Sequence, residues 1–128
     1  MKRLLLLICA VCLLTAGCGQ AVTYKHISHD EARAMTAAQA DVILLDVRTP
    51  QEYEKKHLPD AVLLPIEDIR AGEFSKLSDK KATILIYCRT GRLAVEAAEI
   101  LSANGYENVF EMGGIVNWSG SVAGTDIE

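Results

Sequence analysis

Cys88 and the residues after it are the part of the sequence best suited to chemistry. Residues 86–94 read IYCRTGRLA, so a cysteine is followed by two arginines and a glycine. A thiolate is a strong nucleophile, and guanidinium groups bind anions through planar pairs of donors. Cys88 is either a reactive thiolate beside an anion-binding turn or a small core residue at a strand end. The two arginines favour the thiolate, because an inert buried thiol needs no cations beside it.

The elements around Cys88 place it where a strand gives way to a helix. Residues 83–87 are β-branched and aromatic, which is typical of a buried strand, and residues 93–103 are rich in Ala, Leu and Glu at helical spacing. In the turn between them, backbone N–H groups and the helix dipole favour negative charge. We therefore expect a cradle of amides from about Arg89 to Leu93, with Gly91 free to adopt a positive φ.

The first 17 residues have the pattern of a signal peptide. Two basic residues are followed by an uncharged run over residues 4–16, which is shorter than the roughly 20 apolar residues of a membrane-spanning helix. The sequence LLTAGC, which ends at Cys18, resembles the lipobox of bacterial lipoproteins, in which the cysteine receives a lipid. We predict export to the bacterial cell envelope and a membrane anchor through Cys18, with the folded domain in the periplasm or otherwise outside the cytoplasmic membrane. An ordinary secretory peptide is the alternative.

The cysteine count leads to Cys88 independently. The sequence has four cysteines. Cys9 and Cys12 leave with the predicted signal peptide, and Cys18 is consumed by the lipid, so Cys88 alone keeps its thiol. A single thiol in an exported chain is a candidate reactive group.

Length and composition predict one globular domain. The chain has 128 residues, 50% of them hydrophobic, and a formal net charge of −4. This acidic balance does not favour nucleic acid as a partner. The three histidines lack metal-ligand spacing, so we expect no metal. We also expect no cofactor and a monomeric protein. The predicted organisation is a signal peptide (1–17), a linker (18–23), a domain (24–122) and a C-terminal tail (123–128).

Strand and helix patterns alternate along this domain. Strands are expected at 24–27, 41–46, 61–64, 83–87 and 109–112, and helical segments at 29–36, 50–56, 66–77 (a turn and loop), 93–103 and 115–118. This alternation predicts an α/β fold with an open, mostly parallel five-stranded sheet and helices on both faces. Sites in such folds lie at the carboxyl ends of strands, where Asp46 and Cys88 are expected.

Three separated motifs resemble the single-domain rhodaneses, a family of sulfurtransferases. LLDVRTPQEYEKKHLPDAVLLPI (44–66) is similar to the family signature, YCRTGRLA (87–94) to its active loop, and EMGGIVNWS (111–119) to its closing Gly-Gly-x-x-x-Trp. The commonest active loop reads Cys-Arg-Ser/Thr-Gly-x-Arg-Ser. Here the second arginine, Arg92, stands one position early, and Leu93 and Ala94 follow it.

The resemblance implies a sulfurtransferase that works through a persulfide. The Cys88 thiolate would take the outer sulfur of a donor such as thiosulfate and pass it to a thiol acceptor or cyanide, with ping-pong kinetics. The persulfide and the donor would be bound by Arg89, Thr90, Gly91, Arg92 and Leu93. Thr90 either donates to the anion or satisfies loop amides, and Arg92 either binds the donor or is a solvated residue of the helix start.

Supporting residues are expected around this loop. Asp46 and Arg48 would form an ion pair or loop-shaping hydrogen bonds, and Glu52 would pair with Arg48. His57 is predicted to be structural, and Trp118 to pack in the core.

Two other functions are weighed against sulfur transfer. Phosphatases and arsenate reductases of similar fold have a loop that is one residue longer and ends in an arginine, but this chain has Ala94 at that position. A non-catalytic rhodanese-like module for binding or redox sensing is the remaining alternative.

Overall fold

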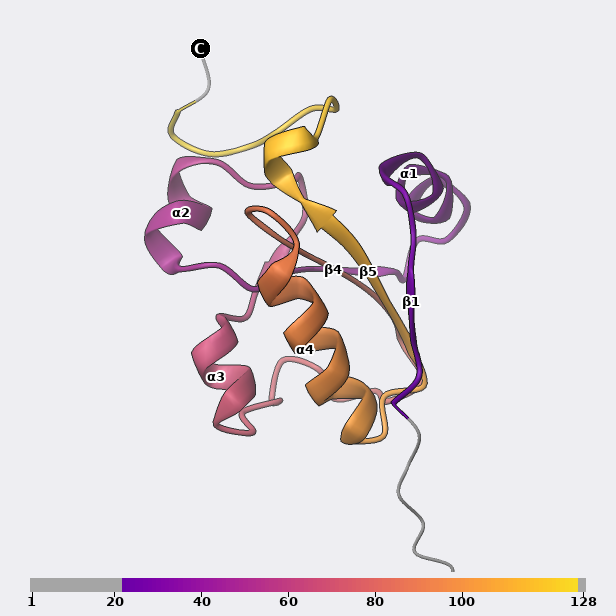
Figure 1. Cartoon of the computed structure of the whole chain (residues 1–128). Helices are drawn as coiled ribbons and strands as arrows, with labels where there is room; N and C mark the ends of the chain where they lie inside the picture. Colours follow the sequence, from indigo (N-terminus) through magenta and orange to yellow (C-terminus); the bar gives the residue numbers. More distant parts are fainter. Residues whose placement is uncertain (1–21, 127–128) are drawn as a thin grey trace, which may run out of the picture.

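A single parallel sheet forms the centre of the computed structural model, which describes residues 22–126 (Figure 1). The strands are β1 (Tyr24–His26), β2 (Ile43–Asp46), β3 (Val62–Leu63), β4 (Thr83–Cys88) and β5 (Asn108–Gly114). Their order across the sheet is β1-β5-β4-β2-β3, and every neighbouring pair is parallel. The predicted five-stranded α/β sheet is therefore confirmed. The predicted signal peptide and Cys18 lie outside the described residues.

Helices follow the strands nearly where the sequence predicts them. They are α1 (His29–Ala38), α2 (Pro50–Lys55), α3 (Ile66–Arg70), α4 (Arg92–Ala103) and a short 3₁₀ helix, η1 (Ile115–Asn117). Capping boxes begin two of them, Ser28 with Glu31 in α1 and Thr49 with Glu52 in α2. Each box satisfies backbone donors that the first turn of a helix leaves free. Helix α4 begins at Arg92, one residue before the predicted start.

The sheet is covered on both faces, as predicted. Helices α3 and α4 lie on one side of it and α1 on the other (Figure 1). Strand β4 is the most enclosed, since Ile84 and Ile86 face one cluster of core side chains while Leu85 and Tyr87 face the other, all at 0% exposure. Side chains alternate along a strand, so burial on both faces explains its unbroken apolar sequence.

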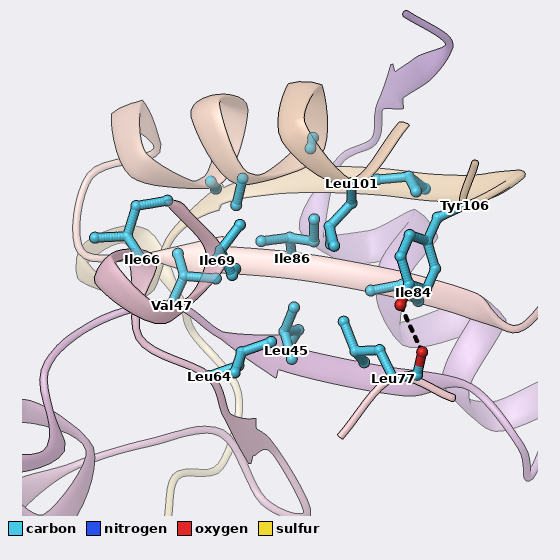
Figure 2. Close-up of a cluster of buried hydrophobic side chains, with 14 of the residues drawn as sticks. Leu45, Val47, Leu64, Ile66, Ile69, Leu77, Ile84, Ile86, Leu101 and Tyr106 are labelled. Carbon is cyan, nitrogen blue, oxygen red and sulfur yellow. Dashed lines mark hydrogen bonds between the residues drawn. The ribbon is translucent and has the colours of Figure 1, made fainter. Parts of the chain in front are cut away.

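The larger core cluster lies between the sheet and the α3–α4 layer (Figure 2). Ile84 and Ile86 of β4 lie there with Leu101 of α4 and Ile69 of α3. At its edge the buried hydroxyl of Tyr106 donates a hydrogen bond to the carbonyl of Leu77 at 2.6 Å. This layer fixes α4, and with it the loop that joins β4 to α4.

The segment after η1 returns to α2. Ala123 and His57 exchange two backbone hydrogen bonds, both 2.8 Å long, and Thr125 donates to the carbonyl of Glu54 at 3.0 Å. Part of the predicted C-terminal tail is thus bound to the domain through residue 126. Within residues 22–126, no helix has the length and apolar character needed to cross a membrane.

Candidate active site

Cys88 is the last residue of β4, and its sulfur lies at the beginning of α4. Gly91 caps this helix with φ +115°, a left-handed conformation that favours glycine, and its N–H donates to the Cys88 sulfur at 3.0 Å. Arg92 is the first helical residue. An N–H donor and a helix N-terminus both stabilise negative charge, so this geometry suits a thiolate.

A cavity of about 180 Å³ opens beside Cys88. It is lined by Cys88, Arg48, Glu52, Arg89, Thr90, Arg92 and Leu93, and we call it the Cys88 cavity. Drug-sized ligands occupy pockets of roughly 300–1,000 Å³, so a cavity of this size suits a small anion. The structure therefore brings most of the predicted site residues to one place. Gly91 contributes its N–H to the sulfur, and Asp46 lies buried behind Arg48.

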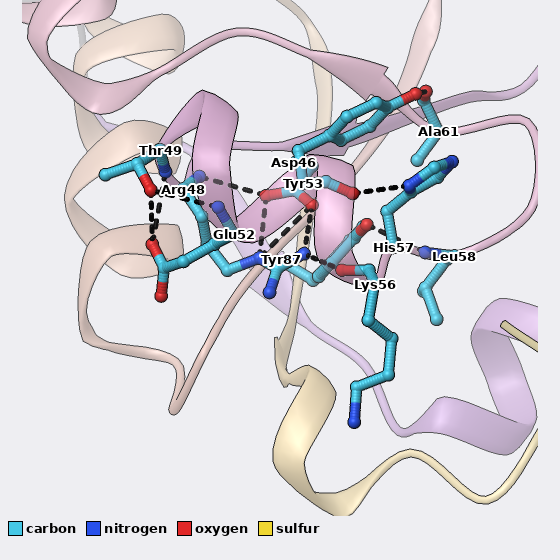
Figure 3. Close-up of polar contacts among 10 residues, drawn as sticks. All are labelled: Asp46, Arg48, Thr49, Glu52, Tyr53, Lys56, His57, Leu58, Ala61 and Tyr87. Atoms are coloured by element: carbon cyan, nitrogen blue, oxygen red, sulfur yellow. Dashed lines mark hydrogen bonds and ion pairs between the residues drawn. The ribbon is translucent and has the colours of Figure 1, made fainter. Parts of the chain in front are cut away.

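Arg48 lines the Cys88 cavity and also forms a buried ion pair with Asp46 (Figure 3). Its Nε lies 3.0 Å from Oδ1 of Asp46 and its Nη2 lies 2.7 Å from Oδ2, while Nη2 also donates to the carbonyl of Lys56 at 2.6 Å. Burial opposes the charge of Arg48, but the hydrogen bonds and charge of Asp46 outweigh it and raise the pKa of the guanidinium. The predicted ion pair of Asp46 and Arg48 is present.

Glu52 has a different partner from the one predicted. Its Oε2 accepts hydrogen bonds from the N–H of Thr49 at 3.2 Å and from the Thr49 hydroxyl at 3.0 Å. The expected pairing with Arg48 is absent among residues 22–126, because Asp46 already holds that guanidinium. Glu52 still lines the Cys88 cavity.

Tyr87 links β4 to the turn after α2. Its hydroxyl is fully buried and accepts a hydrogen bond from the N–H of Leu58 at 3.0 Å. Burial, and then the negative charge of Asp46, raise the pKa of Tyr87 far above its usual value. The phenol therefore remains neutral, and its hydrogen bond to Leu58 holds it beside the ion pair of Asp46 and Arg48.

His57 and Trp118 have packing roles, in line with the predictions. The His57 ring stacks on Tyr53 with 3.8 Å between ring centroids and hydrogen-bonds to the Tyr53 carbonyl at 2.6 Å. Trp118 is half-buried, with its ring edge toward His29 and the Arg33 guanidinium 4.6 Å from its centre. Neither residue lines the Cys88 cavity.

The end of β5 supports the loop between β4 and α4. The sequence did not lead us to predict this contact. Gly114 touches the backbone of Arg89 and Thr90, and the N–H of Val116 donates to the Arg89 carbonyl at 3.2 Å. The register of β4 against β5 shifts between Ile86 and Cys88. The available signal was the pair of consecutive glycines at a strand end, which often marks close backbone approach.

Glu111 is a second residue that sequence reasoning left without a role. It is buried, one oxygen accepts the N–H of Gly113 at 3.0 Å, and the other pairs with Nδ1 of His26. This carboxylate holds the backbone just before Gly114. A charged residue inside an apolar strand was its signal in the sequence.

The fold and the site define a class of protein, and the comparisons agree with it. The family model described as a rhodanese-like domain matches residues 28–121, and the chain belongs to this family. Thiosulfate sulfurtransferase PspE of Escherichia coli is 35% identical over 71 residues, which cover 56% of this chain and 68% of that protein. A sulfurtransferase of Allochromatium vinosum is 39% identical over 98 residues, covering 74% and 88%.

Solved structures show the same likeness. A structure described as rhodanese with anions from E. coli has a TM-score of 0.60 and 30% identity, over 66% of this chain and 99% of that one. The Alr3790 protein of Anabaena has a TM-score of 0.66 and 28% identity, over 75% and 77%. The predicted rhodanese-like fold is confirmed, and the family is one that contains thiosulfate sulfurtransferases.

Proposed function

We propose that this protein is a sulfurtransferase that moves sulfane sulfur from a donor such as thiosulfate to a thiol or cyanide through a persulfide on Cys88. One observation carries the proposal: the Cys88 sulfur accepts the Gly91 N–H at 3.0 Å beside a cavity edged by Arg48, Arg89 and Arg92. A nucleophile and three cations around a small cavity suit an anionic sulfur donor.

In the first half-reaction the Cys88 thiolate attacks the outer sulfur of thiosulfate. A bond forms between the two sulfurs, the sulfur–sulfur bond of thiosulfate breaks, and sulfite leaves with the electron pair. Arg89 and Arg92 bind the sulfonate oxygens, and the Nη1 of Arg48, unpaired within residues 22–126, is a further donor. The mechanism assigns no general base, because the Gly91 N–H and the N-terminus of α4 stabilise negative charge on the Cys88 sulfur.

In the second half-reaction an acceptor thiolate or cyanide attacks the outer sulfur of the persulfide. The bond to the Cys88 sulfur breaks, and Cys88 leaves as a thiolate with its electron pair. The Gly91 N–H and the start of α4 stabilise the anion on Cys88 before and after the transfer.

Phosphatase chemistry is not favoured at this loop. A phosphate-clamping arginine would stand at residue 94, where this chain has an alanine of 0% exposure packed in the core. The small side chain cannot reach an anion. The non-catalytic alternative is weakened because Cys88 lines a cavity with three arginines.

Intact mass spectrometry tests the activity directly. The purified domain is incubated with thiosulfate, and we expect the mass to rise by one sulfur atom and to return when cyanide is added, with release of thiocyanate. Cys88→Ser must lose the adduct. An adduct that persists in this variant removes Cys88 from its role, and a wild-type protein without an adduct favours the binding module.

We also propose that the protein is exported and anchored in the cell envelope by a lipid on Cys18. The support is the signal-peptide pattern and the similarity of LLTAGC to a lipobox. Labelled palmitate should be incorporated by the wild type and lost in Cys18→Ser. Labelling that survives in the variant contradicts the anchor.

A further inference from the structure

A second depression continues the Cys88 cavity away from the sulfur. This α2–α3 groove has a volume of about 420 Å³ and shares Arg48, Glu52, Arg92 and Leu93 with the Cys88 cavity. It lies between α2, α3 and the start of α4. The two hollows therefore adjoin each other at these four residues.

The groove has the size and surface of a small-molecule site. Pockets of roughly 300–1,000 Å³ hold such ligands, and they are mostly apolar with a few polar groups. The apolar part here is formed by Pro50, Pro65 and Ile66 together with Leu93. Thiosulfate or cyanide needs none of this surface, so the groove suits a larger molecule with some apolar character.

Arg70 of the groove is already occupied. Its Nε and Nη2 bind the Glu96 carboxylate at 2.6 and 2.9 Å, and its Nη1 binds Glu67 at 2.6 Å. The hydrogen bonds to Glu96 raise the pKa of this guanidinium. Arg70 is therefore engaged by two carboxylates and is not free to bind a ligand.

Two charges at the junction of the hollows are left for a ligand. Arg92 is exposed and makes no ion pair or hydrogen bond through its side chain within the described part of the chain. Glu52 uses only Oε2 to cap α2, and its Oε1 has no hydrogen-bond partner in residues 22–126. One cation and one carboxylate oxygen thus lie at the boundary of the groove and the Cys88 cavity.

We propose that the α2–α3 groove binds the sulfur acceptor and that this acceptor is a small zwitterionic thiol. After sulfite has left, the carboxylate of the thiol pairs with Arg92 and its ammonium pairs with Glu52. The body of the thiol lies on the apolar surface by Pro65 and Ile66. The thiolate then attacks the outer sulfur of the Cys88 persulfide, leaves as a new persulfide, and releases Cys88 as a thiolate. This inference rests on the proposed sulfur transfer and names the acceptor for it.

Blocking the groove tests the proposal without touching the sulfur site. Gln51 is exposed, lines the groove and is absent from the Cys88 cavity. The variant Gln51→Trp fills the groove, and Gln39→Trp at the exposed end of α1 is the matched control. Each protein is loaded with thiosulfate, and the discharge of the persulfide is followed in a single turnover with cysteinylglycine or with cyanide.

The expected result is selective. Gln51→Trp should discharge to cysteinylglycine at least about ten-fold more slowly, the effect of about 1.4 kcal/mol of lost binding, while cyanide discharge and the control remain unchanged. Discharge to cysteinylglycine at the wild-type rate overturns the groove proposal, and so does an equal loss with cyanide. A wild-type protein that forms no persulfide overturns the proposed function instead, so the two failures are distinguishable.

The charge assignment has its own test. Glu52→Gln removes the carboxylate but keeps a side chain that can cap α2. The preference for cysteinylglycine over its N-acetylated form should fall about ten-fold in this variant. Only cysteinylglycine has an ammonium group that can pair with Glu52, so only its discharge rate depends on this carboxylate. An unchanged preference overturns the role of Glu52.

Discussion

The carbonyl oxygen of Arg89 lies only 2.2 Å from the point that a Cβ atom on Gly114 would occupy. The Cα of Thr90 would lie 2.6 Å from the same point. The end of β5 therefore touches the loop after Cys88 through backbone alone. A side chain at residue 114 would displace the loop that carries the Gly91 N–H.

Gly114→Ala should reduce both stability and sulfur transfer. The added methyl group meets backbone that cannot move freely, so we expect a loss of about 1–3 kcal/mol, as in other overpacked sites. Persulfide formation should slow because the Gly91 N–H shifts away from the sulfur. Urea unfolding and sulfite release measure the two effects. Ala37→Ser, at an exposed position of α1, is the control. Equal activity in both variants contradicts the supporting role.

Asp46→Asn should destabilise the fold strongly. It leaves the Arg48 guanidinium buried without its counter-charge, which costs about 3–5 kcal/mol in comparable pairs. Urea unfolding measures the loss. The exposed pair of Arg70 and Glu96 provides the comparison, because Glu96→Gln should cost less than about 1 kcal/mol. A similar small loss for both variants would show that Asp46 and Arg48 do not act as a buried pair.

Tyr87→Phe should cost about 1–3 kcal/mol. The hydroxyl is the hydrogen-bond acceptor for the buried N–H of Leu58, and its removal leaves that donor unsatisfied. Tyr24→Phe is a control at a half-buried tyrosine whose hydroxyl makes no hydrogen bond within the described residues. Thermal unfolding of the two variants should separate clearly.

The same tyrosine predicts a loss of stability at alkaline pH. Its pKa is raised in the folded protein, whereas an unfolded tyrosine ionises near pH 10. The stabilisation is therefore complete below about pH 10 and is lost as the pH rises above it, because only the unfolded chain releases the proton. The unfolding free energy between pH 9 and 11 should fall less in Tyr87→Phe than in the wild type. Parallel curves would contradict the assignment.

Arg89→Gln and Arg92→Gln should weaken donor binding. A hydrogen bond to a charged group contributes about 1.5–3 kcal/mol, so the KM for thiosulfate should rise about ten-fold or more in each variant. Steady-state assays at fixed cyanide concentration measure this effect. An unchanged KM in Arg92→Gln would show that Arg92 takes no part in donor binding.

Local patterns account for what could be predicted from the sequence. The capping boxes at Ser28 and Thr49, the buried strand before Cys88 and the positive φ of Gly91 all follow from neighbouring residues. The alternation of strands and helices then leads to a parallel sheet with its site at the carboxyl edge, because connections of this kind permit few topologies. The position of the thiol was therefore determined by the sequence itself.

Long-range packing decided the rest. Asp46 rather than Glu52 holds Arg48, Gly114 supports the Arg89 backbone, and Glu111 pairs with His26. These contacts depend on ångström distances between segments that are distant in the sequence or on which of two nearby carboxylates points inward. Side-chain spacing along one strand or helix does not contain that information. The sequence thus determined where the nucleophile lies, and only the tertiary structure decided which residues hold its loop in place.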